Sequence, residues 1–270
     1  MSKEKKMNKN ELLNLCVVGA AGRMGRLVAA LAPEYGFRVT GALEFKGSPA
    51  LGEKCGEAVI TSDIDQALSG ARVAVEFALP EGITERIAKY REYDIPCVIG
   101  TTGVSAEGEQ ALKKAAETIP VIHAANFSLG VNLLAGLLKE AAAALDDSYD
   151  VEIVEMHHRH KKDAPSGTAL MLAASVEEGR SVGKNRELYG RFGLTGERPR
   201  GEIAIHALRG GDVAGDHTVI FAAEGERVEF THKASGRSNF AKGALKAAAF
   251  LTSRKAGMYT MKDVIGIGKK

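Results

Sequence analysis

A run of histidines and lysines carries the densest potential chemistry in the sequence. Residues 155–168 read EMHHRHKKDAPSGT, and three of the seven histidines of the chain lie there. A histidine changes charge near neutral pH, so one of these side chains is suited to donate a proton. Two other interpretations are a solvated basic turn and a metal site. We disfavour the metal site because HExxH spacing is absent and the nearby Arg and Lys would repel a cation.

The end of this run adds a site for a carboxylate. Ser166-Gly167-Thr168 precedes the apolar run ALMLAASVEE, which predicts a helix that begins near Ser166. Hydroxyl groups and the free N–H groups of a first helical turn bind carboxylates well. Together with the basic residues before them, they predict a pocket for a substrate that carries carboxylates.

A glycine-rich turn near the N-terminus is the second candidate site. Residues 19–25 read GAAGRMG, follow the apolar run LCVVG and open a helical segment. The glycines stand first, fourth and seventh, whereas the usual dinucleotide pattern places them first, third and sixth. Small residues still let the backbone approach a pyrophosphate at a helix N-terminus. A tight structural turn would look the same, so the turn alone is weak evidence.

The positions of other polar residues strengthen the dinucleotide interpretation. Glu44 follows the second predicted strand, where an acidic side chain accepts hydrogen bonds from the adenosine ribose. Polar turns also follow the fourth and fifth strands, at residues 100–103 and 126–128. Loops at the carboxyl ends of parallel strands line the ligand crevice of an open sheet. We therefore expect a nicotinamide cofactor, NADH or NADPH.

The first 125 or so residues alternate short apolar strands with helices, which predicts a doubly wound parallel sheet of the Rossmann type. The expected strands are 15–19, 37–43, 72–78, 95–100 and 119–124, and the expected helices are 22–34, 81–93 and 105–117.

The second region has a different texture, which predicts a separate α+β domain with an open, mostly antiparallel sheet. The expected helices are 129–145, one opening near 166 and one at 239–253, with a strand at 151–156 and a charged, glycine-rich loop at 179–201. Three successive strands with short links, at 201–209, 216–223 and 226–233, are expected to pair antiparallel. The expected domains are 1–128 completed by 240–270, which binds the dinucleotide, and 129–239, which binds substrate and forms oligomers.

Composition excludes several classes of protein. The chain has 270 residues, 45% of them hydrophobic, and its 36 basic and 34 acidic residues leave a net charge of +2. No global field therefore favours nucleic acid or an anionic membrane. Cys16, Cys55 and Cys97 are odd in number and form no CxxC pair, so we expect buried free thiols in a reducing compartment. The basic segment 1–10 is expected to be a frayed tail without targeting function, and the protein to be soluble and cytoplasmic.

Six motifs together resemble the dihydrodipicolinate reductase family. They are VVGAAGRMG, VIGTTG, AANFSLGVN, EMHHRHKKDAPSGTA, RGGDVAGDHT and THKASGR, in that family's order, and the resemblance covers residues 13–266. It implies a homotetramer of two-domain subunits, assembled through the open sheet of the second domain. It also implies the reaction: NAD(P)H-dependent reduction of 4-hydroxy-tetrahydrodipicolinate, a small cyclic dicarboxylic imine, to tetrahydrodipicolinate.

The resemblance implies a role for each matching residue. His157 matches the proton donor and Lys161 a second catalytic cation, while His158 matches a substrate-binding position. Ser166, Gly167 and Thr168 match the carboxylate cradle. The implied cofactor contacts are Gly19, Ala20, Ala21, Gly22, Arg23, Met24, Glu44, Gly100, Thr101, Thr102, Ala124, Ala125, Asn126 and Phe127, and no metal is implied. The remaining histidines (His123, His206, His217 and His232) are interpreted as structural or surface groups.

Two positions depart from the family pattern. Many members have a basic residue directly after the acidic residue of the second strand, where this chain has Phe45 followed by Lys46. A second basic position, before the proline of the third strand's loop, is Leu79 here. Both weaken capture of a 2′-phosphate. The alternatives that remain are another small-substrate dehydrogenase and a dinucleotide-binding protein without catalysis.

Overall fold

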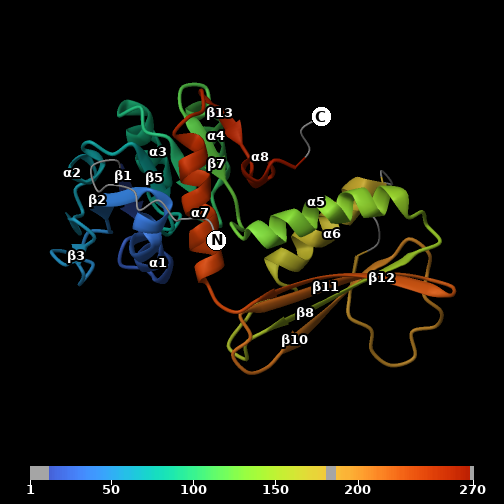
Figure 1. Cartoon of the computed structure of the whole chain (residues 1–270). Coiled ribbons are helices and arrows are strands. Elements are labelled where there is room, and N and C mark those ends of the chain that lie inside the picture. Colours follow the sequence, from blue (N-terminus) through green and yellow to red (C-terminus); the bar gives the residue numbers. More distant parts are fainter. Residues whose placement is uncertain (1–11, 181–186, 268–270) are drawn as a thin grey trace, which may run out of the picture. The chain divides into compact units, whose positions relative to one another are not determined.

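A computed structural model describes residues 12–180 and 187–267 of the chain (Figure 1). The basic segment 1–10 and part of the glycine-rich loop, 181–186, lie outside the described residues. The chain divides into two compact units. Unit 1 comprises residues 1–128 and 238–264, and unit 2 comprises residues 129–237 and 265–270.

Unit 1 is built on a six-stranded sheet in which every neighbouring pair is parallel. In the order β13-β7-β6-β5-β1-β2, its strands are β13 (Gly257–Tyr259), β7 (Pro120–His123), β6 (Cys97–Ile99), β5 (Val73–Glu76), β1 (Leu13–Val18) and β2 (Phe37–Leu43). The strand order reverses at β1, because the chain adds β2 on one side and β5 on the other. The loops after β1 and β5 therefore leave the same edge of the sheet side by side, the usual place for a ligand.

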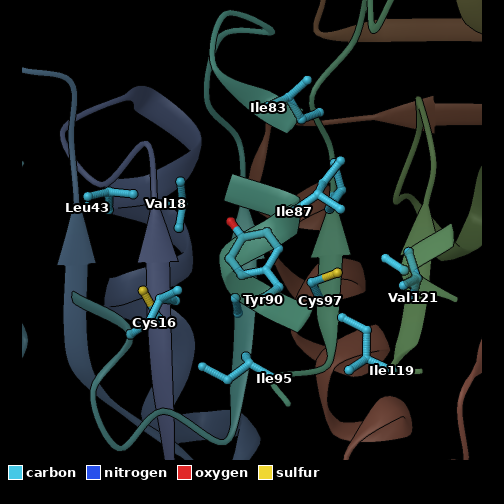
Figure 2. Close-up of a cluster of buried hydrophobic side chains, with 14 of the residues drawn as sticks. Cys16, Val18, Leu43, Ile83, Ile87, Tyr90, Ile95, Cys97, Ile119 and Val121 are labelled. Carbon is cyan, nitrogen blue, oxygen red and sulfur yellow. The ribbon is translucent and has the colours of Figure 1, made fainter. Parts of the chain in front are cut away.

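Helices cover both faces of this sheet, which confirms the predicted fold class. The helices are α1 (Arg23–Leu31), α2 (Ile64–Leu68), α3 (Ile83–Glu92), α4 (Ala106–Ala115), α7 (Ser238–Leu251) and α8 (Met261–Ile265), with a 3₁₀ turn, η2 (Ala32–Tyr35), after α1. On one face α1 packs against α7. On the other face Ile87 and Tyr90 of α3 pack over Cys16 of β1 and Cys97 of β6, as Figure 2 shows.

Local sequence explains where α4 begins and ends. Ser105 accepts a hydrogen bond from the Gly108 N–H at 3.3 Å and so caps the first turn. Acidic residues stand in the first turn and lysines in the last, which suits the helix dipole. Leu112 and Ala115 are completely buried, so the side of the helix that carries them packs into the core of unit 1.

The three cysteines are free thiols inside unit 1, as predicted. Burial raises the pKa of Cys16 and of Cys97 well above the usual range for a thiol. Burial also raises the pKa of Cys55. A thiol with a raised pKa is a poor nucleophile, so these side chains serve packing.

Unit 2 is a five-stranded sheet covered by two helices on one face (Figure 1). In chain order its elements are α5 (Leu129–Ala144), β8 (Asp150–His157), α6 (Gly167–Arg180), β9 (Glu187–Tyr189), β10 (Ile203–Arg209), β11 (Gly215–Ala223) and β12 (Glu226–Ala234). Alternate residues of β8 are buried, and Val151 and Ile153 pack against Leu138 of α5 and Leu172 of α6. No helix in the described ranges is both long and apolar enough to cross a membrane.

The pairing of this second sheet corrects one expectation. The strands at 203–209, 215–223 and 226–234 do not form an antiparallel meander, because β8 lies between β10 and β11. β10 pairs parallel with β8 and with β9, whereas β11 pairs antiparallel with β8 and with β12. The sheet is therefore mixed rather than mostly antiparallel. Only the short Glu224-Gly225 turn joins neighbouring strands as predicted, with Gly225 at φ +88°.

Sequence reading also missed several short elements. They are α2, α8, β9, β13 and the two-residue strands β3 (Lys54–Cys55) and β4 (Ala58–Val59), which form a small hairpin after β2.

A buried carboxylate ties the loops of unit 1 to its sheet. Glu76, the last residue of β5, is completely buried and accepts hydrogen bonds from the Tyr90 hydroxyl at 2.5 Å and from Arg86 at 2.8 Å. The Thr101 hydroxyl lies 2.9 Å from the same carboxylate. Arg86 also donates to the carbonyl oxygen of Leu79 at 2.8 Å. The loops after β5 and β6 are therefore held by one charged group.

We predict that Tyr90→Phe destabilises unit 1. The variant removes a hydrogen bond to a buried charged group, which is worth about 1.5–3 kcal/mol. Tyr93→Phe is the matched control, because Tyr93 donates to Asp65 from an exposed position, where losses stay within about 0.5 kcal/mol. Urea unfolding measures both free energies, and equal losses would show that the Glu76 network does not stabilise the fold.

Candidate active site

The glycine turn of unit 1 is shaped by close backbone contacts. Gly19 follows β1 with φ +77°, and a Cβ there would lie 2.6 Å from the carbonyl oxygen of Phe77. A Cβ on Gly25 would lie 2.1 Å from the carbonyl oxygen of Gly19. Both positions therefore require glycine. Gly22 is the N-cap of α1 and gives no side-chain cap, so its first turn can serve an anion.

Glu44 is fixed against this turn. Its Oε2 accepts the Ala21 N–H at 2.9 Å, and its Oε1 accepts the Phe45 N–H at 3.2 Å. A carboxylate oxygen has room for a second donor, so Glu44 can still accept hydrogen bonds from ribose hydroxyls. The structure thus brings together the glycine turn and the acidic residue that the sequence singled out.

A cavity of about 930 Å³ opens beside Glu44 within unit 1. Its walls include Gly19, Ala21, Gly22, Arg26, Glu44, Phe45, Lys46, Glu53, Phe77, Leu79 and Arg86. Phe45 and Leu79 are 63% and 73% exposed, so both present apolar surface. Large exposed apolar side chains beside a cavity suit the flat face of a purine. Ala20 is buried and Met24 half-buried, whereas Arg23 is exposed on the surface of the turn.

The other predicted cofactor contacts lie on loops after β6 and β7. Gly100 faces the Phe77 ring so closely that a Cβ would lie 2.3 Å from it. Thr101 is buried, and its hydroxyl is used by Glu76 and by the carbonyl oxygen of Ala78, so only its backbone can meet a ligand. Thr102 is exposed.

The loop after β7 is fixed by Phe127, which is buried and lies edge-on to Phe77 at 5.7 Å. Asn126 accepts the Ser128 N–H at 2.8 Å. Ala124 and Ala125 precede this turn, and Ala124 donates its N–H to Ile99. Phe77, on the loop after β5, therefore contacts the loops after β6 and β7 at the carboxyl ends of the strands.

His157, the predicted proton donor, is the last residue of β8 in unit 2. It shares a face of the strand with Glu155, and its Nδ1 lies 2.6 Å from Glu155 Oε2. Burial tends to raise the pKa of Glu155, but hydrogen bonds from Arg209 and His157 leave it below its usual range. The carboxylate is therefore ionised and can only accept, so Nδ1 carries the hydrogen.

Ser166 brings the carboxylate cradle to the same place. Its N–H donates to Glu155 Oε1 at 3.0 Å, and its hydroxyl accepts the Ala169 N–H at 3.2 Å. The hydroxyl therefore caps α6. Gly167 is exposed at the helix start with open space around it, and Thr168 follows half-buried.

His217 is a member of this cluster that sequence reasoning left among the structural histidines. It comes from β11, lies edge-on to His157 at 5.2 Å between ring centres, and shares a 3.1 Å hydrogen bond with Ser166. Burial lowers the pKa of His217 to about 4, so this ring is neutral at pH 7. Its place in the RGGDVAGDHT motif was the only available signal.

The basic loop after His157 is anchored by ion pairs. Lys161 donates to both oxygens of Asp163, at 2.9 and 2.8 Å. Arg209 donates to both oxygens of Glu155 at 2.8 Å and to the carbonyl oxygen of Asp163 at 2.6 Å. Desolvation, and then the nearby charge of Arg237, lowers the pKa of His158. Lys161 and His158 lie on the loop that follows His157. Sequence analysis did not single out Arg209 or Arg237, which the structure adds to this group of residues.

The structure thus gathers two groups of predicted residues, one in each unit. Among the described residues, no group of three or more His, Cys, Asp or Glu side chains could hold a metal ion.

Comparison with known proteins identifies the family. Residues 13–127 match the family model described as dihydrodipicolinate reductase, N-terminus, and residues 130–265 match the model for its C-terminus. A 4-hydroxy-tetrahydrodipicolinate reductase of Nitrosospira multiformis is 46% identical, over 94% of this chain and 98% of that protein. The protein of the same name from Nitrosomonas eutropha is 47% identical, over 95% and 99%.

Solved structures agree. The dipicolinate-bound dihydrodipicolinate reductase from Paenisporosarcina sp. TG-14 superposes with a TM-score of 0.77 at 25% identity, covering 94% of this chain and 99% of that one. The DAP dehydrogenase of C. glutamicum shares the fold at a TM-score of 0.54 and 14% identity, over 93% of each chain. The chain belongs to the dihydrodipicolinate reductase family, as its six motifs predicted.

Proposed function

We propose that this chain reduces 4-hydroxy-tetrahydrodipicolinate to tetrahydrodipicolinate with NADH or NADPH, in the diaminopimelate route to lysine. The observation that carries the proposal is the cluster in unit 2, where a histidine with a fixed Nδ1–H lies beside a helix N-terminus suited to a carboxylate. The family matches over nearly the whole chain support it.

The proposed reaction consumes one hydride and one proton and releases one water. A dinucleotide bound to unit 1 would supply the hydride to C4 of the substrate ring. After water has left the ring, the electrons of the hydride pass into the conjugated imine, and the resulting enamine needs a proton. The protonated ring of His157 would donate that proton from Nε2, because its Nδ1–H is held by Glu155. Lys161 would stabilise the negative charge that develops on the ring.

Residues of unit 2 would bind the two carboxylates of the substrate. Ser166 caps α6 and Gly167 and Thr168 begin it, and the N-terminus of a helix favours an anion. His158 and Lys161, on the loop before it, supply further donors. Lys161 would exchange Asp163 for a substrate carboxylate, which costs little because the side chain of Asp163 is 64% exposed.

Residues of unit 1 fit a dinucleotide. Gly19, Ala21 and Gly22 of the glycine turn line the cavity, and Glu44 has lone pairs left for ribose hydroxyls. We therefore propose that unit 1 binds the dinucleotide and unit 2 the substrate, and the expected domains, 1–128 with 240–270 and 129–239, stay a prediction. The loops at Gly100 to Thr102 and Ala124 to Phe127 stay predicted contacts.

We further propose a cytoplasmic homotetramer without nucleic-acid or membrane partners. The sheet face of unit 2 that turns away from α5 and α6 carries Val154, Met156, Leu208 and Ile220. The strand register places Leu208 opposite Met156, and Ile220 opposite Glu152. Leu208 is 48% exposed, so this face offers apolar surface to another subunit.

Two other functions would use the same fold. Another small-substrate dehydrogenase, or a dinucleotide-binding protein without catalysis, would explain unit 1 but not the cluster of unit 2. Oxidation of NADH or NADPH with freshly prepared substrate distinguishes them, because a non-catalytic protein binds the cofactor without turnover.

We predict that His157→Gln lowers kcat by about 10²-fold or more and changes KM little, since a positioned general acid contributes on that scale. His206→Gln is the matched control, because His206 bonds Glu152 on the opposite face of β8. A His157→Gln variant that retained more than about half of kcat would assign the proton to another group.

We predict that Lys161→Ala and Thr168→Val weaken binding of the planar inhibitor pyridine-2,6-dicarboxylate. Each variant loses a contact to a carboxylate, which costs about 1.5–3 kcal/mol. Calorimetry should show unchanged affinity for NADH in the absence of inhibitor. Equal losses for inhibitor and NADH would instead indicate general damage to the fold.

Cofactor preference depends on the charges around the cavity of unit 1. Glu44 favours the free ribose of NADH and repels a 2′-phosphate. Three cations line the cavity: Arg86, which is paired with the buried Glu76, Lys46, and Arg26, which is paired with Glu53 at 3.2 Å. Both partners of this pair are more than half exposed, so a phosphate could compete for Arg26, though only modestly at physiological salt. We propose that both cofactors work and that NADH serves at least as well.

We predict that Phe45→Arg shifts kcat/KM toward NADPH by up to about tenfold, the effect of one charged contact worth about 1.4 kcal/mol. Phe45→Leu is the control without charge and should leave the ratio unchanged. Both cofactors are compared at saturating substrate and about 0.15 M salt. If the unmodified protein preferred NADPH tenfold or more, Arg26, Lys46 or Arg23 would already form a phosphate site.

A further inference from the structure

We infer that Glu155 is a positioning residue that couples proton donation by His157 to the binding of a substrate carboxylate. The inference rests on the proposed function and deepens it, because it assigns a role to a side chain that does not itself touch the reacting atoms.

One oxygen of Glu155 controls the orientation of His157. Oε2 lies 2.6 Å from Nδ1 and holds the hydrogen on that atom, so Nε2 is the ring nitrogen left to carry the proton that moves. Gly215 leaves space beside this atom, because a Cβ there would lie 3.0 Å from Nε2. The ring is further held by the edge of His217.

The other oxygen of Glu155 controls the cradle. Oε1 accepts the Ser166 N–H at 3.0 Å, one residue before α6 begins at Gly167. Any movement of the carboxylate would therefore displace both the proton donor and the start of the helix that faces the substrate. Because the side chain of Glu155 is completely buried and bonded to Arg209 through both oxygens, it has one orientation.

The charges around His157 give this role a measurable signature. Glu155 on β8 favours the protonated ring, and Arg209 on β10 opposes it. His217 on β11 is neutral near pH 7, and Lys161 on the following loop is compensated by Asp163. If the reaction needs protonated His157, kcat falls as the pH rises. The pH at which this high-pH limb of the kcat profile lies then reports the balance between the charges of Glu155 and Arg209.

Glu155→Gln tests the inference. The variant keeps the shape of the side chain but removes its charge, so kcat should fall by about 10²-fold, the lower end of a general-acid contribution. The high-pH limb of kcat should move to lower pH by about 1 unit, because an opposite charge at this distance stabilises the protonated ring on that scale. Affinity for pyridine-2,6-dicarboxylate should fall as well, since the Ser166 N–H loses a charged acceptor.

Glu152→Gln is the matched control for the loss of a paired carboxylate. Glu152 lies on the same strand but faces the other side, where it accepts hydrogen bonds from Arg191, Arg198 and His206. Its removal should lower stability and leave the limb of the pH profile in place. A limb that moved equally in both variants would overturn the inference.

Arg209→Gln should shift the high-pH limb of kcat in the opposite direction, so it tests the inference even if Glu155→Gln does not fold. Without the guanidinium, Glu155 stabilises protonated His157 more strongly, so the limb should move to higher pH. A limb that stayed in place in Arg209→Gln, or in a folded Glu155→Gln, would overturn the role of Glu155. An unmodified protein that failed to turn over the substrate would instead overturn the proposed function.

Discussion

The buried carboxylate of Glu155 is the interaction on which the arrangement of unit 2 depends. A carboxylate removed from water is costly unless several donors replace the water. Here the donors come from three separate parts of the chain: the end of β8, the start of α6 and the end of β10. The charge can be buried only when all three are in place. The ion network therefore fixes the loop that carries Lys161 without requiring that loop to have an apolar core of its own.

Most of unit 1 could be predicted from the sequence because its signals are local. Its central strands contain apolar runs that end in polar turns, such as LCVV in β1 and CVI in β6, and α4 carries its own cap at Ser105. The short elements missed at β3, β4 and β13 contain two or three residues, too few for any periodicity to show. In unit 2 the predicted pairing of β10 with β11 was wrong, because burial and crossover connections determine which strands become neighbours in a sheet. The short link between β10 and β11 suggested a hairpin that the sheet does not form.

The candidate sites, too, could be predicted only where their residues are close together in the sequence. His157, Ser166 and Thr168 lie within a dozen residues, and Gly19 to Gly25 form one turn, so composition and spacing reveal both. The partners that orient these residues are distant in sequence. Arg209 is 54 residues from Glu155, and His217 is 51 residues from Ser166. A single sequence does not indicate that residues so far apart are in contact. In the sequence, Glu155 looks like an ordinary residue of a strand.

In both units a buried carboxylate fixes a loop that carries predicted ligand contacts. Loops at the ends of parallel strands must expose polar atoms to a ligand, so they cannot be fixed by apolar packing alone. Glu76 at the end of β5 and Glu155 near the end of β8 are both fully buried carboxylates that bind an arginine. Each also accepts a donor from a loop or helix start that carries predicted ligand contacts, Thr101 in unit 1 and Ser166 in unit 2. A charge forces its donors into fewer geometries than an apolar contact would. The loops thereby gain fixed positions while their outer surfaces stay free for a ligand.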